Sequence, residues 1–129
     1  MEKKDTKILI VEDDIMLNKI YQTKLSLLGY QVLAAYDGEE GLAMMRAHQP
    51  HLVLLDLMLP KKNGFEILEA AKQDMTISRI PVIILSNLGK EADLQRSMEL
   101  GAADFLVKSN VKLETVVDKI RIILQNYSG

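Results

Sequence analysis

Short apolar runs alternate along the chain with longer segments in which apolar residues recur every three or four positions. Five runs have the length of a β-strand and are rich in Val, Ile and Leu; they are residues 8–11, 32–35, 52–55, 81–85 and 105–107. They show little polar alternation, which is typical of parallel strands covered on both faces. The intervening segments have helical spacing, clearest in the last one, where Val116, Ile120 and Ile123 share a face. The pattern therefore predicts five strand–helix units.

Residues that end helices or form turns, together with the chain length, indicate how these units assemble. Gly29 and Gly101 stand where helices should end, and Asp37-Gly38 and Lys62-Asn63-Gly64 are predicted as turns. Five units with right-handed crossovers in a short chain favour an open sheet over a barrel. We predict an α/β fold: a doubly wound, flavodoxin-like sheet of five parallel strands, (βα)5, in the order 2-1-3-4-5. Residues 1–129 are expected to form a single domain, with residues 1–6 as a polar N-terminal tail.

Charged residues follow several of the predicted strands at the same end. Glu12 and Asp13 follow the first run, Asp56 follows the third, and Lys108 follows the fifth. Asp56 stands among leucines, where an unpaired buried carboxylate is costly. In a sheet of this order, ligands bind beyond the carboxyl ends of strands 1 and 3. We therefore expect the carboxylates and the lysine to meet at this edge.

Such a cluster suits a divalent metal and a phosphoryl group. Mg²⁺ prefers oxygen ligands in octahedral geometry and keeps several waters. Asp13 and Asp56 can each supply a carboxylate oxygen, the backbone carbonyl of Met58 a third, and Glu12 can hold a metal-bound water. With the charge neutralised by the metal, Asp56 can act as a nucleophile on phosphorus.

Two further residues complete this hypothesis. Lys108 can pair with Asp56 and then with phosphoryl oxygens, and Ser86, at the end of the fourth run, can donate its hydroxyl to them. Simpler roles are available: Asp14 is expected to cap the first helix, Ser86 equally suits a cap or turn, and Lys108 alone suits a solvated surface. The joint placement at four strand ends favours the site.

Composition narrows the classes of function. The net charge is −2 with both signs interspersed, so we expect no nucleic acid to be bound directly. The chain has no cysteine, which excludes disulfides and thiol chemistry. The apolar run after the polar N-terminus is too short for a signal peptide, and no stretch approaches the length of a membrane span. We expect a soluble, cytoplasmic protein with no membrane partner.

The chain resembles the receiver domains of bacterial two-component response regulators, either a stand-alone receiver of the chemotaxis or sporulation type or one excised from a longer protein. The motifs that carry the resemblance, between about Lys7 and Tyr127, are Val11-Glu12-Asp13-Asp14, Leu55 to Pro60 with Gly64, Leu85-Ser86 and Phe105-Leu106-Val107-Lys108. The resemblance implies that Asp56 accepts a phosphoryl group from a phosphohistidine on a sensor histidine kinase or histidine phosphotransfer protein. It also implies that Glu12 and Asp13 are the acidic Mg²⁺ pair, and that Ser86 and Lys108 contact the phosphoryl group.

The resemblance further implies how the signal leaves the domain. Phe105 takes the place of the switch aromatic, whose rotamer follows Ser86, and the output face is the fourth helix, fifth strand and fifth helix. That face would regulate a downstream protein or output domain. A receiver is a signalling switch and not a turnover enzyme, with self-phosphorylation and self-dephosphorylation as its only chemistry.

Two alternatives remain open. A phosphatase or phosphotransferase could use Asp56 as nucleophile, but haloacid-dehalogenase-type enzymes place a second aspartate where this chain has Met58. A receiver-like scaffold that works without phosphorylation is the other. Asn87 and Ser109 keep it open, because the family usually has a small residue and a proline at these positions.

Ser109 and several other residues lead to further expectations about the backbone, self-dephosphorylation and exposure. Without proline, Lys108-Ser109 is expected to be trans, because a cis bond there costs about 2.5–4 kcal/mol. Met58 and Leu88 cannot position an attacking water by hydrogen bonding, so slow self-dephosphorylation is expected. Leu94 and Met98 share a helical face and are predicted to be core. His48 and His51 lack a third ligand and are predicted to be surface residues.

Overall fold

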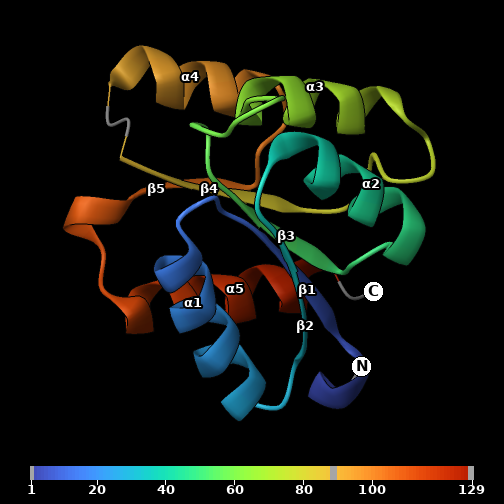
Figure 1. Ribbon diagram of the computed structural model, residues 1–129, viewed down its shortest axis with the longest axis vertical. Helices are drawn as coiled ribbons and strands as arrows, with labels where there is room; N and C mark the ends of the chain where they lie inside the picture. The colour runs from blue at the N-terminus through green and yellow to red at the C-terminus, as the bar shows by residue number, and fades with distance from the viewer. Residues whose placement is uncertain (1, 88–89, 128–129) are drawn as a thin grey trace.

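The computed structural model describes residues 2–87 and 90–127 and contains the parallel sheet that the apolar runs predict (Figure 1). The strands are β1 (Lys7–Val11), β2 (Gln31–Ala35), β3 (Leu52–Leu55), β4 (Val82–Ser86) and β5 (Asp104–Val107). They form one five-stranded sheet in the order β2-β1-β3-β4-β5, and every pairing is parallel. The predicted fold class and strand order are therefore confirmed.

Helices cover both faces of the sheet (Figure 1). On one face lie α1 (Ile15–Leu27) and α5 (Leu113–Tyr127), and on the other lie α2 (Gly38–His48), α3 (Gly64–Gln73) and α4 (Glu91–Glu99). Two 3-10 turns, η1 (Lys3–Asp5) and η2 (Lys108–Asn110), precede β1 and follow β5. This three-layer arrangement leaves the two ends of the sheet free for binding sites.

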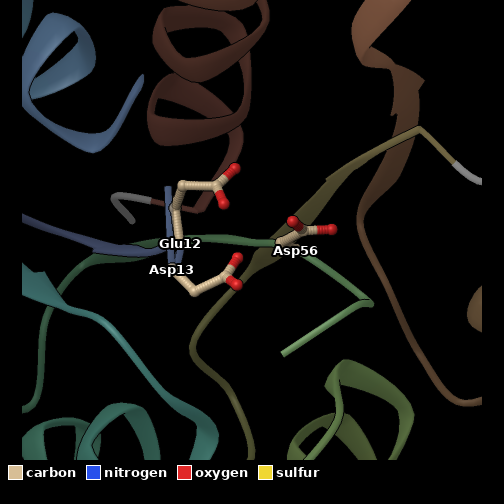
Figure 2. Close-up of side chains that lie close together, drawn as sticks. All are labelled: Glu12, Asp13 and Asp56. Carbon is tan, nitrogen blue, oxygen red and sulfur yellow. The ribbon is translucent and has the colours of Figure 1, made fainter. Parts of the chain in front are cut away.

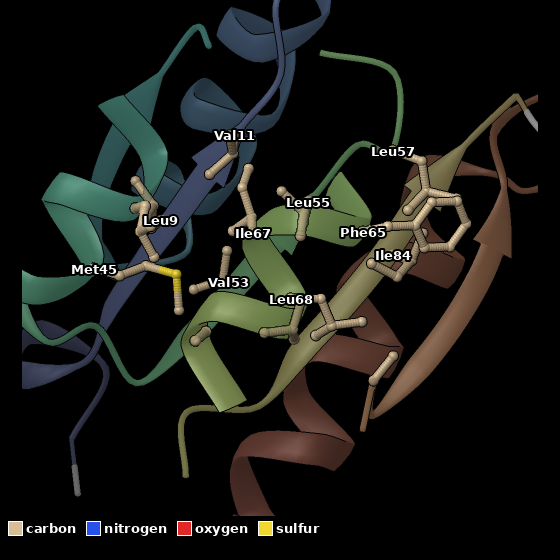
Figure 3. Packing of buried hydrophobic residues seen from close by; sticks show 14 of the residues in the cluster. Leu9, Val11, Met45, Val53, Leu55, Leu57, Phe65, Ile67, Leu68 and Ile84 are labelled. Carbon is tan, nitrogen blue, oxygen red and sulfur yellow. The ribbon is translucent and has the colours of Figure 1, made fainter. Parts of the chain in front are cut away.

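The strands are continuously apolar because they supply two cores at once. In β1, Ile8 and Ile10 face the α1 and α5 side, while Leu9 and Val11 face the α2 and α3 side. Side chains of a strand alternate between faces, so a strand that is covered twice needs apolar residues at every position. Figure 3 shows the second of these cores, where strand residues pack against Met45 of α2 and the apolar face of α3.

Side-chain caps begin the first three helices. Asp14 caps α1 as predicted, accepting a hydrogen bond from the Leu17 N–H at 3.1 Å. Asp37 and Asn63, which we predicted in turns, instead cap α2 and α3. The same short polar side chains satisfy free N–H groups in turns and at helix starts, so sequence alone does not separate the two. As predicted, Gly29 and Gly101 adopt positive φ directly after helices.

The residues predicted as a polar tail are packed against the start of the sheet. Residues 3–5 form η1. The Thr6 hydroxyl donates to the Glu2 carbonyl at 2.9 Å, and the Gln31 amide donates to the Lys4 carbonyl at 2.6 Å. The Lys3 ammonium lies 5.6 Å from the centroid of the Tyr30 ring.

One core prediction is wrong. Leu94 and Met98 on α4 are 43% and 44% exposed, and Ser97 is the residue of that helix that is buried. The Ser97 hydroxyl is satisfied by the Asp93 carbonyl at 2.8 Å. A small residue therefore faces the sheet and lets α4 approach it, which turns the apolar pair outward.

Candidate functional site

The carboxyl ends of β1 and β3 place three acidic residues together. Val11 and Leu55 are register partners, so Glu12 and Asp56 are the next residues of two adjacent strands. The Asp56 N–H continues the ladder by donating to the Val11 carbonyl at 3.0 Å. Figure 2 shows Glu12, Asp13 and Asp56 gathered at this edge. The sequence therefore located the cluster correctly.

The cluster has the composition of a hard-cation site. One carboxylate oxygen from each of Glu12, Asp13 and Asp56 lies within 4.8 Å of the others. Glu12 and Asp56 are only 4% and 6% exposed, whereas Asp13 is exposed. A set of oxygen donors with one solvent-facing side fits Mg²⁺, which keeps part of its water shell. Within residues 2–87 and 90–127, no other group of acidic and histidine side chains has this geometry.

Lys108, the residue directly after β5, also belongs to the site. The Lys108 ammonium donates to Asp56 Oδ2 at 2.8 Å and also forms an ion pair with Glu12 Oε1. The contact with Asp56 was expected, and the contact with Glu12 was not. The Met58 N–H donates to Asp56 Oδ1 at 3.2 Å, so both oxygens of this carboxylate are held.

Burial and charge shift the ionisation of two members of the site. Burial raises the pKa of Glu12 from 4.5 to about 7, the negative charge of Asp56 acts in the same direction, and hydrogen bonds from Lys108 and the Asp14 N–H oppose it. Burial lowers the pKa of Lys108, but its hydrogen bonds to Asp56 and Glu12 outweigh burial and raise it. The lysine therefore stays cationic between two acidic groups.

Ser86 and Phe105 lie on neighbouring strands at the same end. Ser86 is the last residue of β4, is fully buried, and is the register partner of Val107. Phe105 pairs with Ile84 and is buried in the core that contains Phe65, as suits an aromatic without a hydroxyl. Ser86 is thus placed between the ends of β3 and β5, which carry Asp56 and Lys108.

The loops after β4 and β5 contain the departures noted above. The peptide bonds of the described residues are all trans, which confirms the expectation for Lys108-Ser109. After Val107 the chain enters η2 directly. Asn87 is exposed, and Leu88 lies outside the described residues.

Two further residues support the site: Asn18 was not predicted, and Gly64 was predicted only as a turn and motif residue, without this role. Asn18 of α1 is fully buried, and its amide donates to the Glu12 carbonyl at 3.0 Å and the Ala35 carbonyl at 3.1 Å. Its signal in the sequence is a polar residue on the apolar side of a helix. Gly64 begins α3, and a Cβ there would lie 2.5 Å from the Asp56 carbonyl oxygen, so only glycine lets the helix start this close.

The two histidines do not belong to the acidic group at the end of β1 and β3. His48 is exposed, as predicted. His51 is only partly exposed, and its Nδ1 accepts a hydrogen bond from the Lys7 N–H at 3.0 Å. His51 therefore extends the pairing of β1 and β3 at the end of the sheet opposite Asp56.

Comparison with known proteins agrees with this arrangement. A family model described as the response regulator receiver domain matches residues 8–121. A probable transcriptional regulator, ycf27, of Cyanophora paradoxa is 43% identical over 108 residues, which cover 84% of this chain and 44% of that protein. The DNA-binding dual master transcriptional regulator RpaA of Synechocystis is 35% identical over 119 residues, covering 92% and 49%. The chain thus spans about half the length of these relatives.

Solved structures show the same fold. A CheY-like response regulator receiver domain protein from Methanospirillum hungatei superposes with a TM-score of 0.89 at 28% identity, covering 95% of this chain and 96% of that one. The BeF3-activated N-terminal receiver domain of Klebsiella pneumoniae RstA gives a TM-score of 0.85 at 26% identity, covering 92% and 98%.

These relatives correct one prediction. We expected no nucleic acid to be bound directly, but the relatives are named as transcriptional regulators, and RpaA is named as DNA-binding. The prediction was wrong because net charge and the lack of a basic patch describe only the residues counted. They carry no information about the parts of these relatives that this chain does not match. The described residues contain no helix with the length and apolar character needed to cross a bilayer.

Proposed function

This chain belongs to the response regulator receiver family of two-component systems, and from that premise we propose that it is a phosphorylation-dependent switch in which Asp56 accepts a phosphoryl group from a phosphohistidine. The observation that carries the proposal is the environment of Asp56. It is a nearly buried carboxylate beside two other acidic groups, held by Lys108 and by the Met58 N–H. A cluster of buried ionisable groups is costly to form even when its members are paired, and such clusters gather at functional sites.

Each residue of the site has a proposed role. Glu12, Asp13 and Asp56 would hold Mg²⁺ with the Met58 carbonyl, and the bound metal would neutralise the negative charges that otherwise repel an incoming phosphoryl group. Asp56 attacks phosphorus, and the bond from phosphorus to the donor imidazole breaks. Lys108 then passes from the Asp56 carboxylate to the new phosphoryl oxygens.

The signal is proposed to reach the surface through β4 and β5. The Ser86 hydroxyl donates to a phosphoryl oxygen, and Phe105, buried on the adjacent strand, adjusts its ring to the change. The surface that responds is formed by α4, β5 and α5. Leu94 and Met98, exposed on α4, are available to a partner there. Because the relatives are named as transcriptional regulators, we propose a DNA-binding output domain as that partner.

The phosphodonor is proposed to dock along α1. Apolar side chains are exposed on this helix from its first turn to its last; they are Ile15, Met16, Ile20 and Leu27. Met16, Ile20 and Leu27 of this stripe line a groove of about 430 Å³ with Leu113 of α5. Lys19 and Lys24 add positive charge to the same groove. The helix begins directly after Asp13 and its cap Asp14, so a partner on the stripe is adjacent to Asp56. Exposed apolar surface of this kind is typical of protein contacts.

Intact mass after incubation with Mg²⁺ and acetyl phosphate tests the phosphorylation. We expect the mass of one phosphoryl group to be added, and the addition to disappear in Asp56→Asn or when the metal is chelated. Asp118→Asn, an exposed carboxylate of α5, is the matched control and should be phosphorylated normally. Phosphorylation that persists in Asp56→Asn would contradict the proposal. A folded protein that neither gains mass nor binds beryllofluoride would favour the phosphorylation-independent scaffold.

The lifetime of the phosphorylated form is expected to shorten in Met58→Asn. Met58 is exposed beside the site, and its side chain cannot hold an attacking water, whereas an amide can. We expect a shortening on the order of tenfold, smaller than the gain from a full general base. Following loss of the phosphoryl mass with time measures it. Met58→Leu is the control and should keep the long lifetime; an unchanged lifetime in Met58→Asn would refute the role of this position.

A further inference from the structure

A second cavity lies at the opposite end of the sheet from Asp56. It has a volume of about 410 Å³, within the range of small-molecule sites. Thr6, His51 and Pro81, the residues immediately before β1, β3 and β4, line it, and Leu124 of α5 lies along its side. It is therefore built from segments far apart in the sequence that the fold brings together where the strands begin (Figure 1).

The walls of this cavity are mainly apolar and aromatic. Tyr30 lines it and is nearly buried, as are Pro50 and Pro81. Ile80 and Leu124 are partly buried and belong to the edges of the two cores. A ring and two prolines offer rigid surface at little cost in side-chain entropy. The body of a ligand for this cavity is therefore flat and apolar.

The charges around the cavity are all positive. Lys3, Arg79 and Arg121 line it, and no aspartate or glutamate of the described residues does. Arg79 forms no ion pair within the described part of the chain. Arg121 pairs with Asp118 at 3.1 Å, but both side chains are more than half exposed, so this contact is easily exchanged. The protein has a net charge of −2, so three cations gathered beside an apolar wall form a local positive region. Such a region favours an anionic ligand over a cationic one.

His51 adds a directional donor to the lining. Its Nδ1 accepts the Lys7 N–H, which assigns the ring proton of the neutral imidazole to Nε2. The Thr6 hydroxyl is already donated to the Glu2 carbonyl. The lining also holds the Tyr30 hydroxyl and the Gln125 amide, which can both donate and accept. The imidazole and the cationic side chains are the donors that an anionic group requires.

We propose that this cavity binds a small molecule with a flat apolar body and a single anionic group, of the aromatic carboxylate class. The body packs on Tyr30 and the prolines, and the anionic group lies among Arg79, Arg121 and Lys3. The site is separate from the phosphorylation site, so the two can be occupied together. It also joins α5, through Arg121, to the connection before β4 that carries Arg79.

Titration of the isotope-labelled protein with 2-naphthoate, followed by amide chemical shifts, tests the proposal. We expect saturable shifts confined to the cavity, including the amides of Tyr30, His51 and Ile80. Neutral 2-naphthalenemethanol, which has the same ring system, is expected to bind about tenfold more weakly or worse. The double variant Arg79→Gln/Arg121→Gln should weaken naphthoate binding by about tenfold while keeping its thermal unfolding midpoint.

Arg96→Gln is the matched control, since that arginine lies over the Phe65 ring on the other face of the sheet. It should bind naphthoate as the parent does. The proposal is overturned if the shifts lie outside the cavity or do not saturate, if the neutral analogue binds equally well, or if the double variant keeps its affinity. Because none of these readouts involves Asp56, the result is independent of the phosphorylation test.

Discussion

Lys108→Met is expected to lower the free energy of unfolding of the metal-free protein by about 3 kcal/mol near pH 8. The ammonium of Lys108 contacts both Glu12 and Asp56, and these two carboxylates are almost completely buried. Removing it leaves two like charges close together without a cation. Breaking such a pair is far more costly than losing a surface ion pair, because the remaining charges stay desolvated.

Urea unfolding with and without Mg²⁺ measures this effect. The variant should bind Mg²⁺ more tightly than the parent, because no ammonium competes for the acidic groups, and saturating metal should restore most of the lost stability. Lys119→Met is the control: its ion pair with Asp104 is longer, at 3.7 Å, and partly exposed, so a change of less than about 0.5 kcal/mol is expected. Equal stability of Lys108→Met and the parent without metal would show that the contact is not stabilising.

The destabilisation in Lys108→Met is expected to depend on pH. Burial raises the pKa of Glu12 to about 7, above its ordinary value of 4.5. A carboxyl group that holds its proton more tightly in the folded state favours folding when protonated, and this contribution is lost as pH rises from about 4.5 to 7. At low pH, protonation of Glu12 therefore removes one of the two buried negative charges that Lys108→Met leaves without a cation. Lys108 lowers the pKa of Glu12 in the parent, so this pKa rises further in the variant. The difference between variant and parent should therefore be smallest below about pH 7, where Glu12 is protonated in both, and grow as pH rises above about 7.

Gly38→Ala is expected to destabilise the protein by about 2 kcal/mol or more and to slow phosphorylation. A Cβ at this position would overlap the backbone carbonyl of Lys62 and lie 2.8 Å from its Cβ. The Gly38 N–H also donates to the Pro60 carbonyl at 3.2 Å. The start of α2 is thus packed directly on the loop that follows Asp56, and an added methyl group must displace that loop.

A loss of stability in Gly38→Ala would identify the contact between α2 and the loop as its cause. Alanine normally stabilises a helix relative to glycine by roughly 0.5–1 kcal/mol, so a loss of stability can only come from the contact with the loop. Urea unfolding and the phosphorylation rate with acetyl phosphate provide the two readouts. Ala43→Gly, at an exposed position of the same helix, should cost about 1 kcal/mol and leave phosphorylation unchanged. A stabilised or normally phosphorylated Gly38→Ala protein would show that the loop accommodates the methyl group.

The arrangement of the sheet was predictable because its physical signal is local. Parallel strands covered twice must be apolar at every position, so a charge inside or just after such a run, as at Asp56, stands out. Crossover rules limit the possible topologies, and the common doubly wound order, which the structure has, brings Glu12 and Asp56 to one edge. The same reasoning placed Lys108 and Ser86 at the ends of their strands.

Features that depend on side-chain geometry were not predictable. The pattern did not indicate that Lys108 contacts Glu12 as well as Asp56, because that choice depends on rotamers across three strands. Spacing grouped Leu94 with Met98, but it did not reveal which side of α4 meets the sheet, since Ser97 gave no hydrophobic signal. The DNA binding named for RpaA could not be inferred from this sequence, because the residues responsible need not lie in the part of RpaA that this chain matches.

The buried amide of Asn18 has a consequence for how the molecule opens. It ties α1 to the carbonyls of Glu12 and Ala35, where β1 and β2 end. If α1 separated alone, the Glu12 carbonyl would lose this donor at a site with little access to water, and an unsatisfied buried acceptor costs roughly 1–3 kcal/mol. The Ala35 carbonyl would keep only the Glu12 N–H, which lies 3.0 Å away. Local opening of α1 should therefore occur together with opening of the sheet edge, so that the helix and the acidic end of β1 fluctuate as one cooperative unit. A partner docked on α1 would then damp the fluctuations of the acidic end of β1 together with those of the helix.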